Sequence, residues 1–558
     1  MWRLVASGLL GLMTYGCTGP TSSPTTANVP NLAPGPPLSN RVVLATAPPA
    51  TTESNDNRML GQIDIFQLRP QNEYLIGIDA ASGKFVPELA TAWSLGSDGR
   101  SYSFQLRRGV LFHRDNGEFT TDDVVFTWEQ IAAPDSVSSD SPYWRRVVQR
   151  ITPAGSYELT MRLDPDANFA YLISRAGNGM EVRSRTSFQR EGAPSLNTKP
   201  IAGTAPYQFL SRQQGAYVRF ERVPYEHWNL MPDFPEFEFR WIKETSTRLA
   251  ALLTGEVHLA TLSQDLSVQA ERQGMRTVRS RVAASRIFLN PQGIYVRDFD
   301  ALMQGGDGGW LYPDSPLGDV RVRRALQKAI NLDEINRSIF RGKAEVMVHP
   351  ALHPTRPSWN PFFERAFKDE YGYDPQAARQ LLAEAGYGPD RPLETNLHLT
   401  EIAQFPGTLD VTEAVADYWR AIGVKVNLVQ MDTAQRGNLT RQLRFDNHWL
   451  INGSSTDALT FYQNNWGPVF PAGGNPGHGG RDPEMTLAFQ GLRPVMDETR
   501  LTPLLRAAGE IGWRKHLSIN LLWLQAEVMV NPKYVADWVW PGSISGTWTH
   551  VENIKAVH

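Results

Sequence analysis

The stretch FVPELATAWSLGSDGRSYSFQLRRGVLFHRDNGEFTTDDVVF, residues 85–126, carries the densest run of structural signals in the chain. Asp98–Gly99 predicts a turn, and the alternation of apolar and polar side chains over 101–107 predicts a half-buried strand. Thr120 precedes Asp123 by three residues, which approximates a capping box and predicts that a helix follows. None of these patterns is typical of a catalytic site, so the stretch informs on fold first.

Length and composition bound the class of protein. The chain has 558 residues, more than one hydrophobic core normally serves, so two or three domains are expected. It is 41% hydrophobic and 20% charged, which is typical of a soluble globular protein. The formal net charge of −3 argues against a general nucleic-acid binder or a binder of anionic membranes, so no nucleic-acid partner is expected.

The N-terminus has the pattern of an export signal. One basic residue, Arg3, precedes an apolar run over residues 4–13 that is too short to span a membrane. The only cysteine, Cys17, follows at a place that resembles the end of a bacterial lipoprotein signal, residues 1–17, where the cysteine is lipidated. Residues 18–40 are rich in Pro, Thr and Ser and predict a disordered tether. We expect a lipid-anchored extracytoplasmic protein; an ordinary secretory signal with an incidental cysteine is the alternative.

The remaining patterns predict alternating helices and strands, which indicates an α/β architecture. The clearest are a strand at 41–47, a helix at 245–253, a helix capped by Asp319, a helix capped by Asp374, a strand–helix–strand unit over 393–428, a helix at 501–513 and a buried strand at 519–525.

Motifs for catalysis or metal binding are missing from the sequence. His349 and His353 are four residues apart, but Pro350 lies between them and no Glu completes a zinc-binding helix. No G-x-S-x-G pattern occurs, and the only cysteine lies in the leader. His113 is expected to be a structural hydrogen-bonding residue. We therefore expect no enzymatic activity, no metal and no cofactor.

Short motifs spread over residues 85–424 follow one another in an order that identifies a family. They are P-E-L-A at 87–90 with Trp93, D-G at 98–99, G-T-A-P-Y at 203–207, G-E-V at 255–257, V-R-R-A-L at 322–326, L-L-A-E-A-G-Y at 381–387, and Trp419 with I-G-V at 422–424. Together they resemble the extracytoplasmic solute-binding proteins of family 5, the large peptide, oligopeptide and nickel receptors of ABC importers.

The resemblance implies a bilobed α/β fold of the periplasmic-binding-protein type II kind, with an extra subdomain in the N-terminal lobe. Segments 41–78, 198–290 and 505–558 would form lobe I, residues 79–197 the accessory subdomain and residues 291–504 lobe II. Such a receptor closes around its solute by hinge motion and delivers it to a permease with its ATPase. The expected partners are therefore these transporter subunits and a solute, with the membrane reached through Cys17, and the protein is expected to be a monomer.

The resemblance also suggests where the solute binds. In peptide-binding relatives an Asp in the loop that resembles residues 452–461 holds the amino group of the peptide, and Asp457 followed by Phe461 resembles that motif. Aromatic side chains can form the walls of such a cleft, although core packing is the alternative for each. The candidates are Phe461, Tyr462, Trp466, Trp449 and Tyr207.

The choice of solute stays open at this level. A peptide or oligopeptide is the default, yet Gln404-Phe405 stands where dipeptide binders carry an Arg, and residues 453–454 lack a carboxylate. An oligosaccharide or another organic solute stacked on aromatic rings is therefore the main alternative. An extracytoplasmic hydrolase and a signalling or chaperone receptor are further alternatives, the hydrolase being disfavoured by the missing catalytic motifs.

Overall fold

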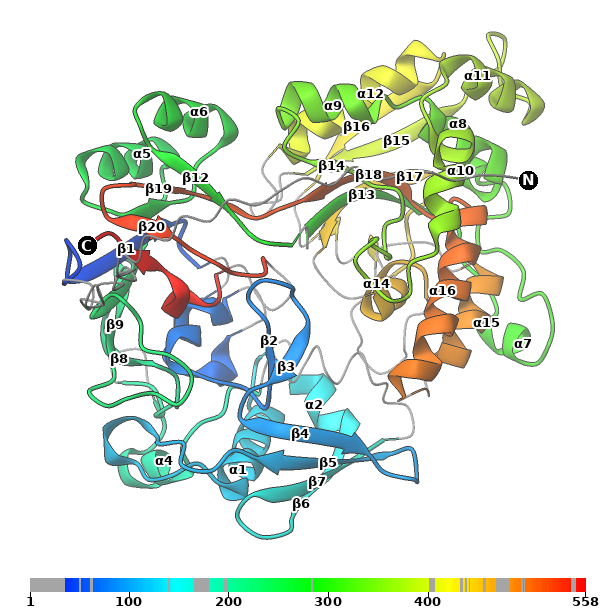
Figure 1. Ribbon diagram of the computed structural model, residues 1–558. Helices are drawn as coiled ribbons and strands as arrows, with labels where there is room; N and C mark the ends of the chain where they lie inside the picture. Colours follow the sequence, from blue (N-terminus) through cyan, green and yellow to red (C-terminus); the bar gives the residue numbers. More distant parts are fainter. Residues whose placement is uncertain are drawn as a thin grey trace, which may run out of the picture. The chain divides into compact units, whose positions relative to one another are not determined.

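Three sheets, of seven, six and four strands, carry most of the β-structure in the computed structural model (Figure 1). The structure describes residues 36–49, 52–60, 64–138, 141–164, 180–194, 199–282, 285–400, 407–431, 435–436, 439–440, 442–454, 458–467, 482–492, 495, 497–542 and 548–558. Within these ranges residues 37–557 belong to one packed unit.

Strand β1 (Arg41–Thr46), which the sequence predicted at 41–47, lies at the centre of the seven-stranded sheet. The strand order is β12 (Arg276–Arg279), β19 (Glu527–Val530), β11 (Leu259–Ala260), β1, β10 (Glu236–Trp241), β9 (Tyr217–Arg222) and β8 (Tyr207–Gln213). Strand β1 runs parallel to both of its neighbours, and five of its six residues are buried. Such burial is typical of a central parallel strand, because both sheet faces are covered. Helix α5 (Thr245–Thr254), which the sequence predicted, ends at Gly255 in the left-handed conformation.

The six-stranded sheet is built from chain segments that lie far apart in the sequence. Its strand order is β14 (Glu345–Val346), β18 (Ile519–Leu524), β13 (Ser285–Gln292), β17 (His448–Ser454), β15 (Glu394–Leu399) and β16 (Lys425–Gln430). Helix α12 (Thr408–Ala421) connects β15 to β16, which confirms the predicted strand–helix–strand unit. The Trp419 ring of this helix packs 5.7 Å from that of Trp449, and its Nε1 donates to Leu326 O at 2.9 Å.

Residues 85–126 supply two strands of the four-stranded sheet, and residues 148–163 supply the other two. The strand order of this sheet is β4 (Ala90–Leu95), β5 (Ser101–Leu106), β7 (Glu158–Leu163) and β6 (Val148–Pro153). The predicted strand is β5, and the predicted capping box opens α1 (Thr121–Ala132). There Thr120 N donates to the Asp123 carboxylate at 3.0 Å. This hydrogen bond gives a partner to one of the backbone N–H groups at the start of the helix.

The other elements are short strands, helices and 3₁₀ turns. The helices are α2 (Ser141–Val147), α4 (Arg185–Glu191), α6 (Gln264–Arg272), α7 (Phe299–Met303), α8 (Val320–Lys328), α9 (Leu332–Ile339), α10 (Pro361–Tyr371), α11 (Pro375–Glu384), α14 (Ala458–Asn465), α15 (Pro483–Leu492) and α16 (Glu498–Arg514). The strands are β2 (Ile76–Ile78), β3 (Phe85–Pro87), β20 (Val535–Asp537) and β21 (Lys555–Ala556). The 3₁₀ turns are η1 (Asn57–Met59), η2 (Ile65–Gln71), η3 (His113–Asp115), η4 (Pro316–Gly318) and η5 (Val551–Asn553).

The chain crosses between the two large sheets twice, along neighbouring paths. Strand β12 pairs with β19 in one sheet, and β13, which follows β12 in the chain, pairs with β18 in the other. Between these pairs Ser280 N donates to Ala526 O at 2.8 Å, and Ala526 N donates to Ser280 Oγ at 3.0 Å. Figure 1 shows the two crossings side by side, in green and red.

The strand pairings differ from the residue ranges that the sequence analysis expected for lobe I. Strand β18 falls within 505–558 and most of β13 within 198–290, both expected in lobe I, yet both strands belong to the six-stranded sheet. Sheet membership would thus move the segment ends to the short links between β12 and β13 and between β18 and β19. The reason is that β13 and β18 pair with each other, which turn signals in the sequence do not reveal. The division into lobes stays a prediction.

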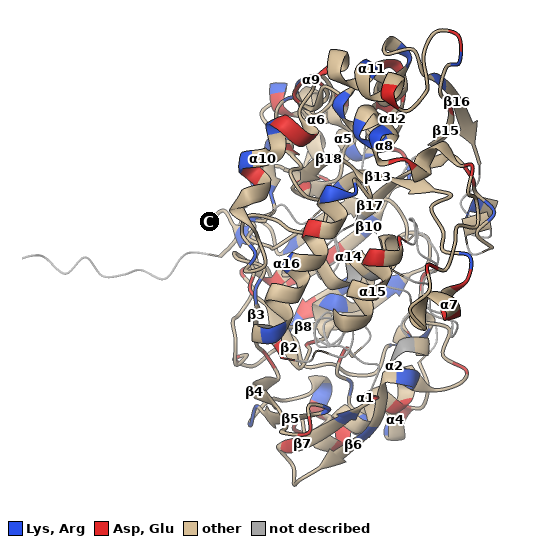
Figure 2. Ribbon diagram, turned by 90° about the vertical axis from the view of Figure 1, so that its right-hand side faces the viewer, with Lys and Arg blue, Asp and Glu red and all other residues tan. Residues whose placement is uncertain are grey.

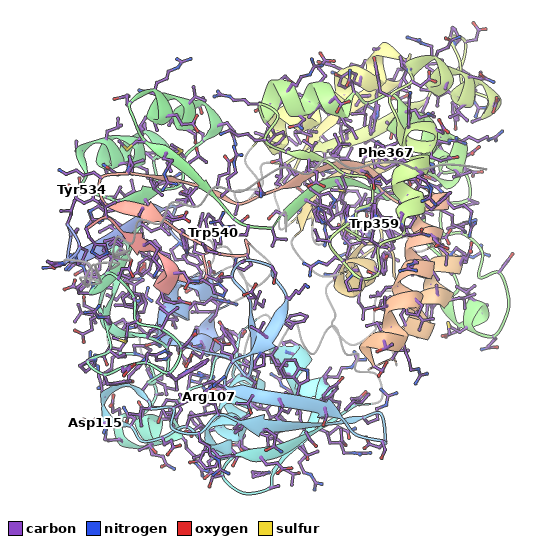
Figure 3. The ribbon with its side chains drawn as sticks, in the orientation of Figure 1. Arg107, Asp115, Trp359, Phe367, Tyr534 and Trp540 are labelled. Atoms are coloured by element: carbon purple, nitrogen blue, oxygen red, sulfur yellow. The ribbon has the colours of Figure 1, made fainter. Side chains whose placement is uncertain are left out.

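A membrane span requires a helix of sufficient length and hydropathy. Among the helices that the structure describes, none is both long and apolar enough to cross a membrane. Helix α10 carries residues of both charge signs, as Figure 2 shows. Aromatic side chains pack against one another in the cores. The Trp540 ring stacks on that of Trp538 with 4.3 Å between the ring centroids, and the Phe367 ring stacks on that of Tyr371 at 5.9 Å (Figure 3).

His113, in η3, joins the region of the four-stranded sheet to the segment that leads into β8. Its Nε2 lies 2.7 Å from Ala205 O, and its backbone N donates to Gly203 O at 3.0 Å. Burial lowers the pKa of its imidazole to about 4. The ring is therefore neutral at pH 7, and the expected structural role of His113 is confirmed.

We expect His113 to make the protein less stable in acid. The unfolded chain titrates this histidine near pH 6.5, so below that pH the unfolded state binds a proton that the folded state rejects until about pH 4. This one group then lowers the free energy of unfolding by about 2 kcal/mol between pH 7.5 and pH 5. Urea titrations at pH 7.5 and pH 5 measure the difference in the free energy of unfolding between the two pH values. His113→Gln should make this difference about 2 kcal/mol smaller than in the wild type. The exposed His558→Gln is the control and should leave the difference unchanged.

The packing of α16 against the Trp466 ring depends on a glycine. A Cβ atom built at Gly512 of α16 would lie 2.1 Å from Trp466 Cζ3. The indole is held in place because its Nε1 donates to Ser518 Oγ at 2.8 Å, and Ser518 Oγ donates to Asn290 Oδ1 at 2.9 Å. A side chain at position 512 must therefore displace a buried, hydrogen-bonded ring.

Gly512→Ala is expected to destabilise the fold by about 1–3 kcal/mol, the usual cost of overpacking a filled core. Gly491 is the matched control, because it is also helical, in α15, and a Cβ there meets no atom within 4 Å. Gly491→Ala should be neutral or stabilise by up to about 1 kcal/mol, since alanine favours helix. Chemical unfolding of both variants measures the contrast, and equal effects would contradict the packing described for Trp466.

Candidate functional site

The carboxyl ends of three parallel strands form the edge at which we place the candidate site. Strand β15 runs parallel to β16 on one side and to β17 on the other. The connection from β15 to β16 and that from β16 to β17 therefore run in opposite directions along the sheet. In open α/β sheets, ligands bind outside the carboxyl ends of the strands at such a switch point.

Three polar groups from separate segments meet at this edge. Thr400 follows β15, Arg436 comes from the connection between β16 and β17, and Ile451 belongs to β17. Nη1 of Arg436 lies 3.4 Å from Thr400 Oγ1 and 3.4 Å from Ile451 O. Burial lowers the pKa of the Arg436 guanidinium. The edge thus holds a partly dehydrated positive charge.

A cluster of two histidines and a phenylalanine lies next to this charge. His398 precedes Thr400 by two residues, so both side chains lie on one face of the strand. Its ring centroid is 5.1 Å from both Phe445 and His448. Burial, then the neighbouring His448 and Arg436, lower the pKa of His398 to about 3. Neither ring nitrogen of His398 has a hydrogen-bond partner in the described part of the chain.

The residues that the sequence suggested for the site lie elsewhere or outside the described ranges. Asp457 and the lipidation candidate Cys17 both fall outside those ranges. The described aromatic candidates are fully buried in hydrophobic cores: Tyr207 in that of the seven-stranded sheet, Trp449 beside α12, and Phe461, Tyr462 and Trp466 around α14.

The contacts of these aromatic residues are those of core side chains. Tyr207 donates its hydroxyl hydrogen to Phe234 O at 2.9 Å, and Tyr462 donates to Leu505 O at 3.0 Å. Phe461 packs 5.0 Å from Phe288. Their role as walls of a solute cleft stays a prediction. Arg436 and His398, by contrast, were not singled out from the sequence. The signal that could have found them is the strand–helix–strand unit, because it predicts parallel strands with a common carboxyl edge.

The histidine pair of the sequence is a loop pair, as expected. His349 Nε2 lies 3.1 Å from Gly509 O, and its Nδ1 accepts from Ala351 N at 3.0 Å. His353 lies beside Thr355 and Glu345 instead of a second ligand. Among the described residues no group of three or more His, Cys, Asp or Glu side chains is arranged to hold a metal ion.

Comparison with known families gives one extended match. The family described as bacterial extracellular solute-binding proteins, family 5 Middle, matches residues 84–471, which is more than half of the chain. The match begins one residue before the stretch 85–126, covers all of it, and includes the strands of the candidate site.

Individual relatives and solved structures agree with this match. The di/tripeptide-binding protein 2 of Pseudomonas aeruginosa is 26% identical over 79% of this chain and 82% of its own length. The dipeptide-binding protein of Escherichia coli is 24% identical over 70% of this chain and 72% of its own. The periplasmic binding protein DppA from Helicobacter pylori, solved in complex with the peptide STSA, superposes with a TM-score of 0.66 at 20% identity, over 92% of this chain and 98% of that one. The fold is thus the bilobed α/β type expected from the sequence.

Proposed function

Because the chain belongs to family 5 of the bacterial extracellular solute-binding proteins, we propose that it is the receptor of an ABC importer and that its solute is a peptide. The observation that carries the proposal is the match over residues 84–471. Relatives named for di- and tripeptide binding, and neighbours solved with a bound peptide, favour a peptide as the solute.

In this proposal the receptor works by binding and release, without chemistry on the solute. The solute occupies the carboxyl edge of β15, β16 and β17, where Thr400 and Arg436 lie. In the part of the chain that the structure describes, the two large sheets are joined by the links that contain Ser280 and Ala526, so we place the bending there. Solute that binds the closed state better than the open state then shifts the population to the form that a permease and its ATPase accept.

We further propose that the protein lies outside the cytoplasm, attached through lipid at Cys17. The support is the sequence pattern of residues 1–17, with the only cysteine at its end, followed by the Pro- and Thr-rich segment 18–40. Two acyl chains hold a protein firmly on a membrane, whereas one gives only marginal binding. A monomer on such a tether can stay close to its transporter while it captures solute.

We expect peptides to stabilise the purified protein against heat. A ligand that binds only the folded state adds about 2.7 kcal/mol at 100 times its Kd, which corresponds to a shift of a few degrees in Tm. A thermal-shift panel of di-, tri- and oligopeptides, with oligosaccharides beside them, measures this effect, and native mass spectrometry identifies any solute that co-purifies. A shift with sugars but none with peptides would refute the peptide assignment. Turnover of a peptide during the assay would refute a purely binding role.

Lipid attachment predicts where the protein fractionates. Full-length protein expressed in a bacterial host should sediment with the membranes, whereas Cys17→Ser should be recovered in the soluble extracytoplasmic fraction because it lacks the acylated thiol. Ser22→Ala, in the following tether, is the control and should behave like the wild type. Membrane recovery of Cys17→Ser equal to that of the wild type would exclude Cys17 as the anchor.

A further inference from the structure

Lys343 lies between the two large sheets, close to the links that join them. It belongs to the turn between α9 and β14, and β14 pairs with β18 in the six-stranded sheet. Its Nζ lies 3.6 Å from Oε1 of Glu271 in α6, and 3.9 Å from Oε2 of Glu527 at the start of β19. Strand β19 belongs to the seven-stranded sheet, and α6 leads into β12 of the same sheet. One lysine from one sheet thus faces two carboxylates from the other.

The ammonium group of Lys343 depends on these two carboxylates for compensation of its charge. Its Nζ is buried, and among the described residues it has no hydrogen-bond partner, since both carboxylates lie just beyond hydrogen-bond distance. A buried charge is costly unless an opposite charge lies near it. The hydroxyl of Thr277, and then Lys343, hold the pKa of the Glu271 carboxyl below its usual value, although burial acts in the opposite direction. The contact is therefore an attraction between charges that reaches from one sheet to the other.

The turn that carries Lys343 is held in a fixed shape. Arg341 and Gly342 both have left-handed backbone conformations, with φ of 57° and 73°, and for an arginine this conformation is strained. Asn336 of α9 ties the turn down: its Nδ2 donates to Ala344 O at 2.7 Å, and its Oδ1 accepts from Ala344 N at 3.1 Å. Gly342 N also donates to Asn336 O at 2.9 Å. The backbone on both sides of Lys343 is therefore fixed to α9, which aims the lysine at the other sheet.

Both carboxylates have a second partner within their own sheet. Glu527 accepts from Arg279 Nε of β12 at 2.7 Å, and Glu271 accepts from Thr277 Oγ1 of β12 at 2.5 Å. Loss of the lysine would therefore leave neither carboxylate without a partner. The seven-stranded sheet does not need Lys343 for its own structure, so the contact acts on how the two sheets are held relative to each other.

The place of the contact couples it to movement of the sheets. Glu527 directly follows Ala526, whose hydrogen bonds with Ser280 join the two links. Glu271 lies further into the seven-stranded sheet's side of the links, in α6. Rotation of one sheet about the links would change the distance from Lys343 to Glu271, because the two residues belong to different sides of the links. The attraction is therefore strongest in one arrangement of the sheets.

We infer that Lys343 forms an ion bridge to Glu271 and Glu527 across the links, and that this bridge stabilises the present arrangement of the two sheets against an arrangement rotated about the links. Lys343 is thus a positioning residue, which acts on solute binding through the sheets. The inference rests on the hinge of the proposed function, and the experiment below is readable without any solute.

The test measures the distance between two spin labels, one on each side of the links. Ala250→Cys in α5 and Glu413→Cys in α12 supply the attachment sites, because both positions are exposed and both helices pack on their own sheet. Cys17→Ser removes the only native cysteine. Pulsed electron paramagnetic resonance then gives the distribution of distances, and hence the populations of the arrangements, in the protein without solute.

Removing or reversing the charge at position 343 should change these populations. Lys343→Met should lower the ratio of the present arrangement to rotated ones about two- to fivefold, the range for loss of a partly exposed ion pair. Lys343→Glu should lower it further, because the new carboxylate repels Glu271 and Glu527. The charge-swapped variant, Lys343→Glu with Glu271→Lys, should return the distribution toward that of the wild type, since the attraction is restored.

Arg337→Glu is the matched control, because Arg337 is exposed on α9 and donates to Asp333 O of the same helix. It reverses one charge on the same side of the links, so it should leave the distance distribution unchanged. Melting temperatures of all variants establish that each is folded. The inference is overturned if Lys343→Glu keeps the wild-type distribution, or if the charge-swapped variant departs from the wild type by the sum of its two single changes.

The bridge and the proposed function can fail separately. A tripeptide added to the labelled wild type should move the distance distribution, because solute shifts the population toward the closed form. If no peptide binds, the peptide assignment fails, whereas the comparison of Lys343 variants without solute still decides on the bridge. If a peptide binds and moves the distribution but Lys343→Glu does not, the receptor function stands and the bridge is refuted.

Discussion

The two large sheets are joined by two antiparallel strand pairs that follow one another along the same two chain segments. The β12–β19 pair belongs to the seven-stranded sheet, and the β13–β18 pair, reached from it by two short links, belongs to the six-stranded sheet. The mutual hydrogen bonds of Ser280 and Ala526 keep the links in register. The strands between residues 285 and 524 form the six-stranded sheet. After β18 the chain returns through the second link, and β19 completes the seven-stranded sheet.

These pairings also position the edge of the six-stranded sheet that holds the candidate site. Strand β13 is committed to β18 on one side and pairs with β17 on the other, both antiparallel. Strands β15 and β16 then add to β17 in parallel order, since helix α12 returns the chain to the same end of the sheet. Their carboxyl ends meet, and the connections after them bring Thr400 and Arg436 to one place.

The stability of the core and the chemistry of this edge are separated in the molecule. Aromatic side chains such as Phe461 and Trp466 are closely packed, and a polar chain through Ser518 and Asn290 orders them. Arg436 has weak contacts and an incomplete set of partners. A residue in a core is expected to be satisfied by its neighbours, whereas a binding residue is completed by its ligand. This difference is why burial by itself does not identify the site.

The sequence by itself determined the local elements and the family. Turn, cap and periodicity signals predicted β1, β5, α1 and α12, because these depend on neighbouring residues, and the ordered motifs over 85–424 predicted the fold type. Only the tertiary structure decided that β18 joins β13 and that the aromatic candidates for the site are packed in cores. It also decided that Arg436 lies beside Thr400 and contributes to the lowered pKa of His398. These facts depend on pairing between segments tens to hundreds of residues apart, and hydrophobic periodicity does not encode which strands will pair.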